Sequence, residues 1–385
     1  MWNVRGAKMR ILLVHEDSVV KRASGSTRYA EYFLNQENLD VDVLHKGPAM
    51  RVGKNTFFSF FLNMPHIRGL NETILPVIRY YRTRKHIRDK VKLLEILYDL
   101  IHSNTVHIAD YLSVSEKPTV ITFHGVAATE CKYVTNLEKM RTEYHALNSE
   151  KNVLTKKTDK LAKIVAVSDL IKRELQSEYD VPADKIRVIH NGIDTELDKP
   201  TTDDPTGDYF LYVGRLDKRK GFYELFDVMK KLPDQKFVVI SSIYKYGKPS
   251  KYSKALCDLS KKQNNIMIKP NISDEDLKRY YSNAIATILP SRYDPFPYTV
   301  LESMACGTPC IVSSNSGSVE AIGKYGAVFQ AGSSTSLKEA IESLSYPDTW
   351  RQEVRKRVEN LFSVDVFMNK ILSLYKEVIE EHTGI

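Results

Sequence analysis

Two acids that lie eight residues apart mark the segment of this sequence best suited to chemistry. Asp294 lies in a loop after an apolar strand at 284–289, and Glu302 lies on the helix that this loop opens. Pro297 suits the first helical position, so the next three amides, at 298–300, have no carbonyl partner within the helix. Such a helix start binds phosphate, whereas a carboxylate repels phosphate and accepts hydrogen bonds from hydroxyls. Phosphate and hydroxyls together indicate a sugar nucleotide; the alternative is an ordinary strand–turn–helix with a solvated acid.

A basic loop follows the first strand of the second half of the chain. This strand, at 209–213, leads into Gly214, Arg215 and, five residues further on, Lys220. Ligands of parallel sheets bind at the carboxyl ends of the strands, so both basic side chains are expected to hold a diphosphate there. The alternative is a solvated basic loop, which is the usual role of such charge runs.

Two loops in the first half of the chain could also contact a ligand. Ser24-Gly25-Ser26 separates the first strand from its helix, and glycine there allows the backbone to approach a ligand closely. His124 and Gly125 end the strand at 119–123, and a histidine at this position can contact a ligand hydroxyl. An ordinary surface loop and a capped core histidine are the respective alternatives.

Strand-like apolar runs alternate with helical patterns throughout, which is typical of α/β proteins with parallel sheets. The expected strands are 10–14, 41–44, 105–108, 119–123, 163–167 and 186–189, then 209–213, 237–240, 266–268, 284–289, 310–312 and 327–329. A polar segment with Pro and Gly at 198–207 reads as a linker. We therefore expect two Rossmann-like domains, 1–200 and 207–363, facing each other across a deep cleft. A final helix within 364–385, apolar at Phe367, Ile371, Leu374 and Val378, is expected to pack back towards the first domain.

Composition narrows the class of protein. The 385 residues are 42% hydrophobic and 10% aromatic, as in folded globular proteins. The sequence has no run of eighteen apolar residues and no secretory signal before the first strand, where Met9 could itself be the translation start. Four cysteines in a chain of this length do not form a disulfide framework. This cysteine usage fits a reducing, cytoplasmic compartment. We expect no need for a metal or cofactor, because no cluster of metal-ligating residues is recognisable.

An aromatic and basic insert distinguishes the first half. Apolar residues at 57–62 and 74–78 precede the stretch 79–92, which holds seven basic residues and one acid, and the net charge of the chain is +8. Apolar side chains beside a basic run suit an anionic membrane surface, so residues 57–92 are expected to bind the inner face of a membrane. The alternative is an aromatic core segment leading into a helix with a solvated basic face. We expect no nucleic-acid partner, because no nucleic-acid-binding motif is present.

Together these motifs resemble the retaining glycosyltransferases of family 4, which have the GT-B fold. The resemblance covers nearly the whole chain and is strongest in the segments 190–194, 214–221 and 294–309. It implies that residues 1–200 bind the acceptor and residues 207–363 the nucleotide sugar. The chain departs from the family pattern at Asp294, where Glu is usual, at Pro297, where Gly is usual, and at 316–318, where a Gly-Gly pair is common.

The resemblance implies a role for each candidate residue. Asp294 would hold hydroxyls of the donor sugar, Glu302 the ribose, and Arg215 with Lys220 the diphosphate, while His124 would approach the transferred sugar. The donor-binding set is Gly25, Ser26, Arg215, Lys220, Asp294, Phe296, Pro297, Tyr298, Thr299 and Glu302, and the catalytic set is His124, Asp294, Arg215 and Lys220. The implied reaction is a metal-independent, retaining transfer of a hexose from a UDP- or GDP-sugar to a glycan or lipid-linked acceptor.

Two other functions remain open from the sequence. Some sugar-nucleotide epimerases share the two-domain fold, but they need acid–base residues at the sugar carbon. A non-catalytic subunit that binds nucleotide sugars is the third class, and the departures at Asp294 and Pro297 favour it slightly.

Overall fold

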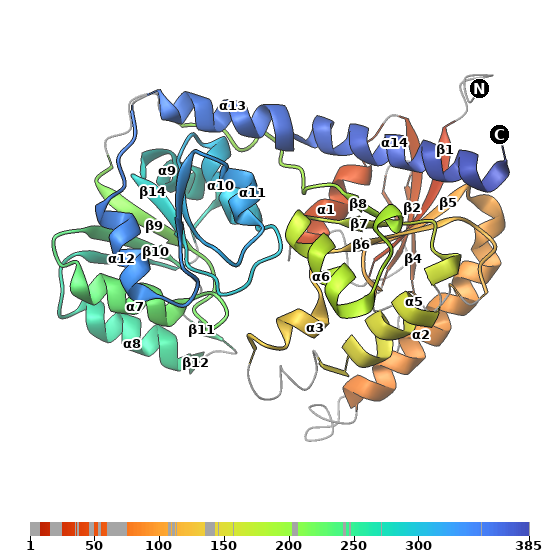
Figure 1. Ribbon diagram of the computed structural model, residues 1–385, viewed down its shortest axis with the longest axis horizontal. Coiled ribbons are helices and arrows are strands. Elements are labelled where there is room, and N and C mark those ends of the chain that lie inside the picture. The colour runs from red at the N-terminus through yellow and green to blue at the C-terminus, as the bar shows by residue number, and fades with distance from the viewer. Residues whose placement is uncertain are drawn as a thin grey trace.

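The fold is taken from a computed structural model of the chain. The structure describes residues 8–15, 25–34, 36, 38–45, 50–52, 55–59, 75–106, 109, 112, 114–134, 143–144, 146–156, 158–201, 207–241, 244–245, 248–270, 272–347 and 349–384. Two α/β lobes lie side by side, and two long helices near the carboxyl end run along both of them (Figure 1).

The first lobe is built on an eight-stranded sheet with the order β3-β4-β2-β1-β5-β6-β7-β8. Its strands are β1 (Met9–Val14), β2 (Leu39–His45), β3 (Met50–Val52), β4 (Asn55–Ser59), β5 (Leu100–Ser103), β6 (Thr119–Phe123), β7 (Lys163–Ala166) and β8 (Ile186–Val188). Its longer helices are α1 (Gly25–Leu34), α2 (Leu75–Leu94) and α6 (Asp169–Tyr179), with the shorter α3 (Ala127–Glu130) and α5 (Lys151–Lys156). All neighbouring strands are parallel except β3 and β4. Parallel strands need crossovers, and the helices between them supply these.

Two sequence-based expectations in this lobe were wrong or incomplete. The strand expected at 105–108 is β5, which ends at Ser103, and the described residues of 105–108 form no strand. His102 and Ser103 made the true strand look polar, yet both are fully buried, and His102 is hydrogen-bonded to Tyr375 and Thr122. The aromatic segment at 57–62 begins inside β4, which pairs with β2, and its residues 60–62 lie outside the described part of the chain.

The second lobe has a six-stranded parallel sheet with the order β13-β10-β9-β14-β15-β16. Its strands are β9 (Tyr209–Val213), β10 (Lys236–Ile240), β13 (Ile266–Lys269), β14 (Ala286–Leu289), β15 (Cys310–Ser313) and β16 (Gly326–Phe329), beside a small hairpin of β11 (Tyr244–Lys245) and β12 (Lys248–Pro249). Its helices are α7 (Phe222–Lys231), α8 (Lys251–Ser260), α9 (Asp274–Asn283), α10 (Tyr298–Ala305), α11 (Ser318–Ile322), α12 (Ser334–Glu342) and α13 (Trp350–Phe362). Because β9 and β14 are neighbours, the loops that follow them emerge at the same edge of the sheet.

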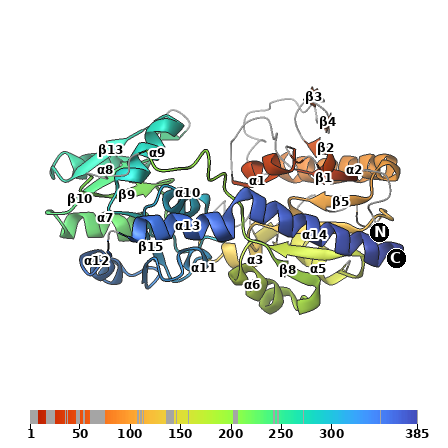
Figure 2. The same cartoon turned by 90° about the horizontal axis from the view of Figure 1, so that it is seen from above.

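The last helix, α14 (Val364–Thr383), returns to the first lobe and lies across it (Figures 1 and 2). Its predicted apolar face is confirmed, because Phe367, Ile371, Leu374 and Val378 are all buried. They share a core with residues of β1 and α1, among them Tyr29. The chain therefore passes between the lobes twice, once before β9 and once at Ser363. Among the described residues, no helix is both long and apolar enough to cross a membrane.

Candidate active site

The loops after β9 and β14 meet in an ion pair. Lys220 Nζ lies 2.5 Å from Asp294 Oδ2, and Ser291 Oγ donates to the same oxygen at 3.3 Å. Asp294 is only 6% exposed, and the side chain of Lys220 is 20% exposed. The structure thus brings together the expected phosphate-binding lysine and the expected hydroxyl-binding acid, from loops 74 residues apart.

A glycine at the start of α7 allows this approach. Gly221 has a φ of 73°, in the left-handed region that favours glycine. A Cβ at Gly221 would lie 1.8 Å from the carbonyl oxygen of Pro290, so any side chain would push the two loops apart. Asp217 Oδ1 accepts a hydrogen bond from Lys220 N at 2.9 Å and fixes the backbone just before the helix.

Arg215 is on the same loop but does not join the ion pair. Its side chain is 61% exposed, and Nη2 lies 3.5 Å from Asp217 Oδ2. Tyr212 OH donates to the Arg215 carbonyl at 2.6 Å, which fixes the backbone there. The Arg215 guanidinium therefore lies in solvent at the surface of the loop, where it contacts Asp217.

The start of α10 differs from the expectation in one respect. Pro297 is the N-cap residue, and the helix begins at Tyr298. The Pro297 carbonyl accepts a hydrogen bond from Val300 N at 3.3 Å, so this amide is already bonded. The amides of Tyr298 and Thr299 stand in the first turn, where the helix itself supplies no acceptor.

The segment after β15 contacts the loop between β14 and α10 and fixes its backbone. Gly317 N donates to the Asp294 carbonyl at 2.9 Å, and Ser316 Oγ donates to the same oxygen at 3.1 Å. A Cβ at Gly317 would lie 1.8 Å from the Pro295 carbonyl oxygen. The Ser316-Gly317-Ser318 segment therefore fixes the backbone of Asp294.

Glu302 makes contacts that the sequence did not indicate. Its Oε1 accepts a hydrogen bond from Arg28 Nη1 at 2.6 Å, and its Oε2 accepts one from Tyr281 OH at 2.9 Å. Burial raises the pKa of Glu302, while the charge of Arg28 and the Tyr281 hydrogen bond oppose this rise. Arg28 lies on α1 of the other lobe and also pairs with Asp198. The chain offered no signal for Arg28 beyond its place three residues after Gly25.

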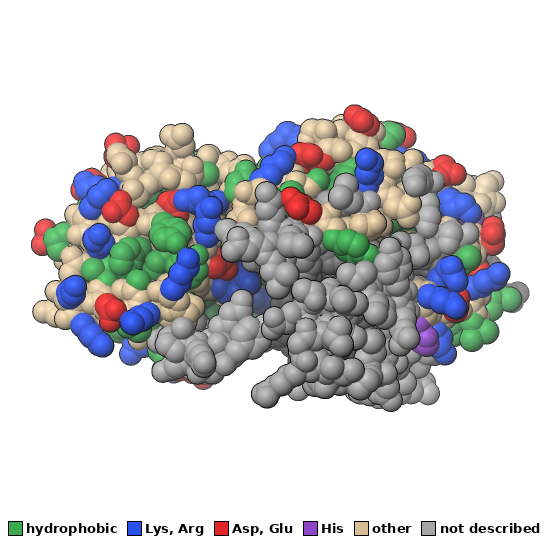
Figure 3. Space-filling model, turned by 90° about the horizontal axis from the view of Figure 1, so that it is seen from below, with side chains coloured by type: hydrophobic (Ala, Val, Ile, Leu, Met, Phe, Trp, Pro, Cys, Tyr) green, Lys and Arg blue, Asp and Glu red, His purple; other side chains and the backbone are tan. Residues whose placement is uncertain are grey.

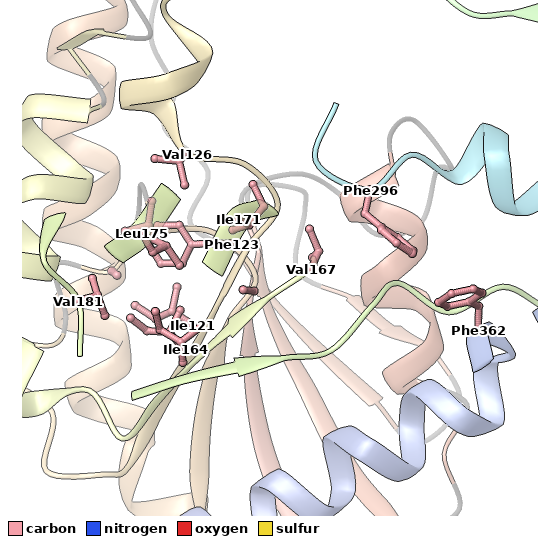
Figure 4. Close-up of a cluster of buried hydrophobic side chains, with 14 of the residues drawn as sticks. Ile121, Phe123, Val126, Ile164, Val167, Ile171, Leu175, Val181, Phe296 and Phe362 are labelled. Atoms are coloured by element: carbon pink, nitrogen blue, oxygen red, sulfur yellow. The ribbon is translucent and has the colours of Figure 1, made fainter. Parts of the chain in front are cut away.

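Phe296 is part of the junction between the lobes. Its ring lies 4.8 Å from the His190 ring and 5.6 Å from the Phe362 ring. Figure 4 shows Phe296 and Phe362 beside apolar residues of the first lobe such as Val167. The Phe296 carbonyl accepts a hydrogen bond from Asn191 Nδ2 at 2.9 Å. The ring therefore packs in a core that joins the two lobes.

His124 lines a pocket of about 180 Å³ in the first lobe, together with Asn104, Thr105, Val106, Thr122, Phe123, Gly125, Ala127, Glu130 and Glu150. Its Nε2 is 2.7 Å from Asn104 Oδ1, and its ring lies nearly perpendicular to the Tyr29 ring with the ring centres 4.8 Å apart. Burial lowers the pKa of His124 to about 3, so the ring is neutral at physiological pH. A Cβ at Gly125 would lie 3.4 Å from Pro295 Cγ, so the pocket opens beside the Asp294 loop.

The amino-terminal glycine loop is described only in part. Gly25 and Ser26 form the first turn of α1, and Ser24 lies outside the described residues. Their backbone therefore opens the helix that carries Arg28.

Polar contacts of Tyr293 and Glu320 also fasten the lobes to each other. Tyr293 OH donates to Glu174 Oε2 at 2.7 Å and accepts a hydrogen bond from Val126 N at 3.3 Å. Burial raises the pKa of Glu174 to about 7. Glu320 of α11 accepts hydrogen bonds from the first amides of α6, at Asp169 and Leu170, and so caps a helix of the other lobe. The sequence reading missed these contacts.

Within the described ranges, no group of three His, Cys, Asp or Glu residues is arranged to hold a metal ion. Lys220 places a positive charge beside Asp294, and Arg215 lies on the same loop as Lys220.

Comparison with known families assigns the chain. Residues 194–360 match the family described as glycosyl transferases group 1, and residues 28–197 match glycosyltransferase family 4. The chain is a glycosyltransferase, with the family 4 model on its first lobe and the group 1 model on its second. The two matches meet between Asp194 and Leu197, just before the passage from the first lobe to the second.

Several curated members of this family resemble parts of the chain. An uncharacterized glycosyltransferase, MJ1607, of Methanocaldococcus jannaschii is 31% identical over 41% of this chain and 44% of its own. The capsular polysaccharide biosynthesis glycosyltransferase CapM of Staphylococcus aureus is 26% identical over 57% and 63%. The O-antigen chain mannosyltransferase B of Escherichia coli is 24% identical over 63% and 65%. The aligned part therefore spans less than two thirds of each of these relatives.

Solved structures of other proteins share the fold over nearly the whole chain. Sucrose-phosphate synthase from Thermosynechococcus elongatus aligns with a TM-score of 0.74 and 18% identity, covering 97% of this chain and 100% of that one. Anabaena Alr3699/HepE in complex with UDP-glucose aligns with a TM-score of 0.69 and 16% identity, covering 98% and 100%. The expected α/β GT-B fold of two Rossmann-like lobes is thereby confirmed.

Proposed function

We propose that the protein is a glycosyltransferase that moves a hexose from a UDP- or GDP-sugar to an acceptor hydroxyl, with retention of configuration and without a metal ion. The observation that carries the proposal is the Lys220–Asp294 pair at the edge of the second sheet. A cation for phosphate and an acid for hydroxyls lie side by side there, as a sugar bound through a diphosphate requires. Family membership and the UDP-glucose complex of HepE support a nucleotide-sugar donor.

Each group then has a separate task. Lys220, Arg215 and the amides at the start of α10 stabilise the charge on the leaving diphosphate, the term that usually dominates such catalysis. Asp294 accepts hydrogen bonds from the sugar hydroxyls, and Glu302 accepts those of the ribose. Neutral His124 lies in the pocket beside the Asp294 loop, where it can hydrogen-bond the transferred sugar without adding charge.

The proposed reaction takes place on one face of the sugar. The bond between the anomeric carbon and the phosphate oxygen breaks, and the acceptor oxygen forms its bond to the same carbon from the same side. The leaving phosphate oxygen takes the proton of the acceptor hydroxyl, so no separate base is needed. The lobes enclose the site and exclude water, which favours transfer over hydrolysis.

We further propose that the acceptor is a glycan or a lipid-linked saccharide at an anionic membrane surface. Helix α2 carries the basic run at 79–92, with Lys85 and Lys92 exposed, and Leu93 and Ile96 are 67% and 81% exposed beside them. Lys and Arg side chains are present on both lobes in the view from below (Figure 3). Pelleting with anionic liposomes at low salt should carry the protein down, and protein that stays in the supernatant rules the surface out.

The donor site is tested by thermal unfolding with UDP, GDP, ADP and their hexose conjugates, without metal. A ligand at a hundred times its Kd stabilises a protein by about 2.7 kcal/mol, so one nucleotide should stand out. No shift with any nucleotide would overturn the donor site. Product analysis with labelled donor then distinguishes transfer, which gives a new glycoside, from epimerisation, which gives a different nucleotide sugar.

A further inference from the structure

Arg28 joins three parts of the molecule at one point. It lies on α1 of the first lobe with its side chain 14% exposed, and Nη1 is 2.6 Å from Glu302 Oε1 of the second lobe. Its Nη2 bonds Asp198, which precedes the passage between the lobes. Its Nε donates to Tyr32 OH at 3.1 Å, and the guanidinium lies 5.2 Å from the centre of the Tyr298 ring. Each of the three guanidinium nitrogens therefore has an acceptor, which fixes the orientation of this planar cation.

The acid that Arg28 binds is fixed from two sides. Tyr298 and Glu302 are four residues apart on α10 and lie on one face of the helix, so the same guanidinium contacts both. Tyr281 OH bonds the other oxygen of Glu302. Each carboxylate oxygen can accept two hydrogen bonds, so one acceptor position remains on each oxygen. Two neighbouring acceptors of fixed direction match a pair of adjacent hydroxyls.

We propose that Arg28 is a positioning residue for the nucleotide, which holds Glu302 so that both of its oxygens accept from the 2′- and 3′-hydroxyls of the ribose. This inference rests on the proposed function, and it adds that the ribose site is complete only when a residue of the first lobe contacts the second. An ion pair that only fastened the lobes would affect all ligands of the second lobe alike. A positioning residue affects only ligands that carry both hydroxyls.

The test compares ligands that differ only at the ribose. Calorimetric titration of the full chain uses whichever of UDP, GDP and ADP binds, its 2′,3′-dideoxy form, and inorganic pyrophosphate. For the wild-type protein, the dideoxy form should bind about tenfold more weakly than the parent nucleotide, since hydrogen bonds to a charged group are lost. Arg28→Gln should bind the parent nucleotide about tenfold more weakly than wild type, yet bind the dideoxy form and pyrophosphate as wild type does.

Two further variants make the result decisive. Arg187→Gln breaks an exposed ion pair between β8 and Glu377 of α14, away from the site, and should leave all three affinities unchanged. Arg28→Lys keeps the charge but cannot reach both acids. Its preference for the parent nucleotide over the dideoxy form should therefore lie between those of Arg28→Gln and wild type. If Arg28→Gln does not fold, Arg28→Lys replaces it in the test. A preference for the parent nucleotide over the dideoxy form that equals the wild-type preference would then overturn the inference.

Failure of the Arg28 inference and failure of the proposed function give different results. An equal loss for the parent and dideoxy forms in Arg28→Gln would overturn the positioning role and leave the donor site standing. A wild-type protein that binds no nucleoside diphosphate would overturn the proposed function, and this inference with it.

Discussion

Replacing Asp294 with asparagine should separate sugar recognition from diphosphate binding. The variant keeps the shape of the side chain and an oxygen that accepts from Lys220, but it removes the negative charge. We expect it to bind the nucleoside diphosphate more tightly than wild type while transferring sugar more slowly.

The size of the effect follows from the ion pair. Lys220 and Asp294 are 2.5 Å apart with side chains 20% and 9% exposed, so water screens them only in part. Hydrogen bonds between charged groups contribute about 1.5–3 kcal/mol net, and a neutral acceptor keeps about half of that. About 0.75–1.5 kcal/mol of the interaction of Lys220 then becomes available to a phosphate, which is roughly four- to twelvefold in Kd. Loss of the charged contact to the sugar hydroxyls should slow transfer by about tenfold to a hundredfold.

Calorimetry with the nucleoside diphosphate and a transfer assay with labelled donor give the two quantities. Asp208→Asn is the matched control, because Asp208 pairs with Lys236 at the exposed surface of the same lobe, and it should change neither quantity. If Asp294→Asn weakens diphosphate binding as much as it slows transfer, Asp294 supports the loop as a whole, and its assigned contact with the sugar is wrong.

Three other changes test the packing around the site. Phe367→Ala removes a fully buried ring of α14 and should lower the free energy of unfolding, measured by urea denaturation, by about 3–5 kcal/mol. A loss below 1 kcal/mol would contradict the role of α14 in the core. Burial raises the pKa of Glu150 to about 7, so folded protein holds a proton that unfolded chain has released, and stability should fall as the pH rises from 5 through 7. Glu150→Gln should make this decline shallower, and an unchanged slope would exclude Glu150 as its source. Glu320→Ala removes the acceptors of the Asp169 and Leu170 amides, while Ser168 remains as the N-cap residue of α6. It should lower the free energy of unfolding by about 1–2 kcal/mol and widen the molecule in small-angle scattering. Unchanged dimensions would show that Glu320 does not hold the lobes together.

The parts of the site that the sequence predicted are those governed by local pattern and sheet topology. Apolar runs located β9 and β14, and the rule that ligands bind at strand ends placed Lys220 and Asp294 at one edge. By contrast, Arg28 and Glu302 are 274 residues apart, and no periodicity relates them. The true position of β5 was hidden for a different reason, because His102 is polar in the sequence but satisfied by Tyr375, a residue of a helix far along the chain.

The return of α14 to the first lobe has a consequence for the order of folding. Domains made early in synthesis usually fold before the rest of the chain has emerged from the ribosome. Here Tyr29 and Phe33 of α1 pack on Phe367, which the ribosome adds after the whole second lobe. The nascent first lobe therefore has an uncovered apolar face for most of translation. Until that helix is made, this face is a site where chaperones can bind and where neighbouring chains can aggregate.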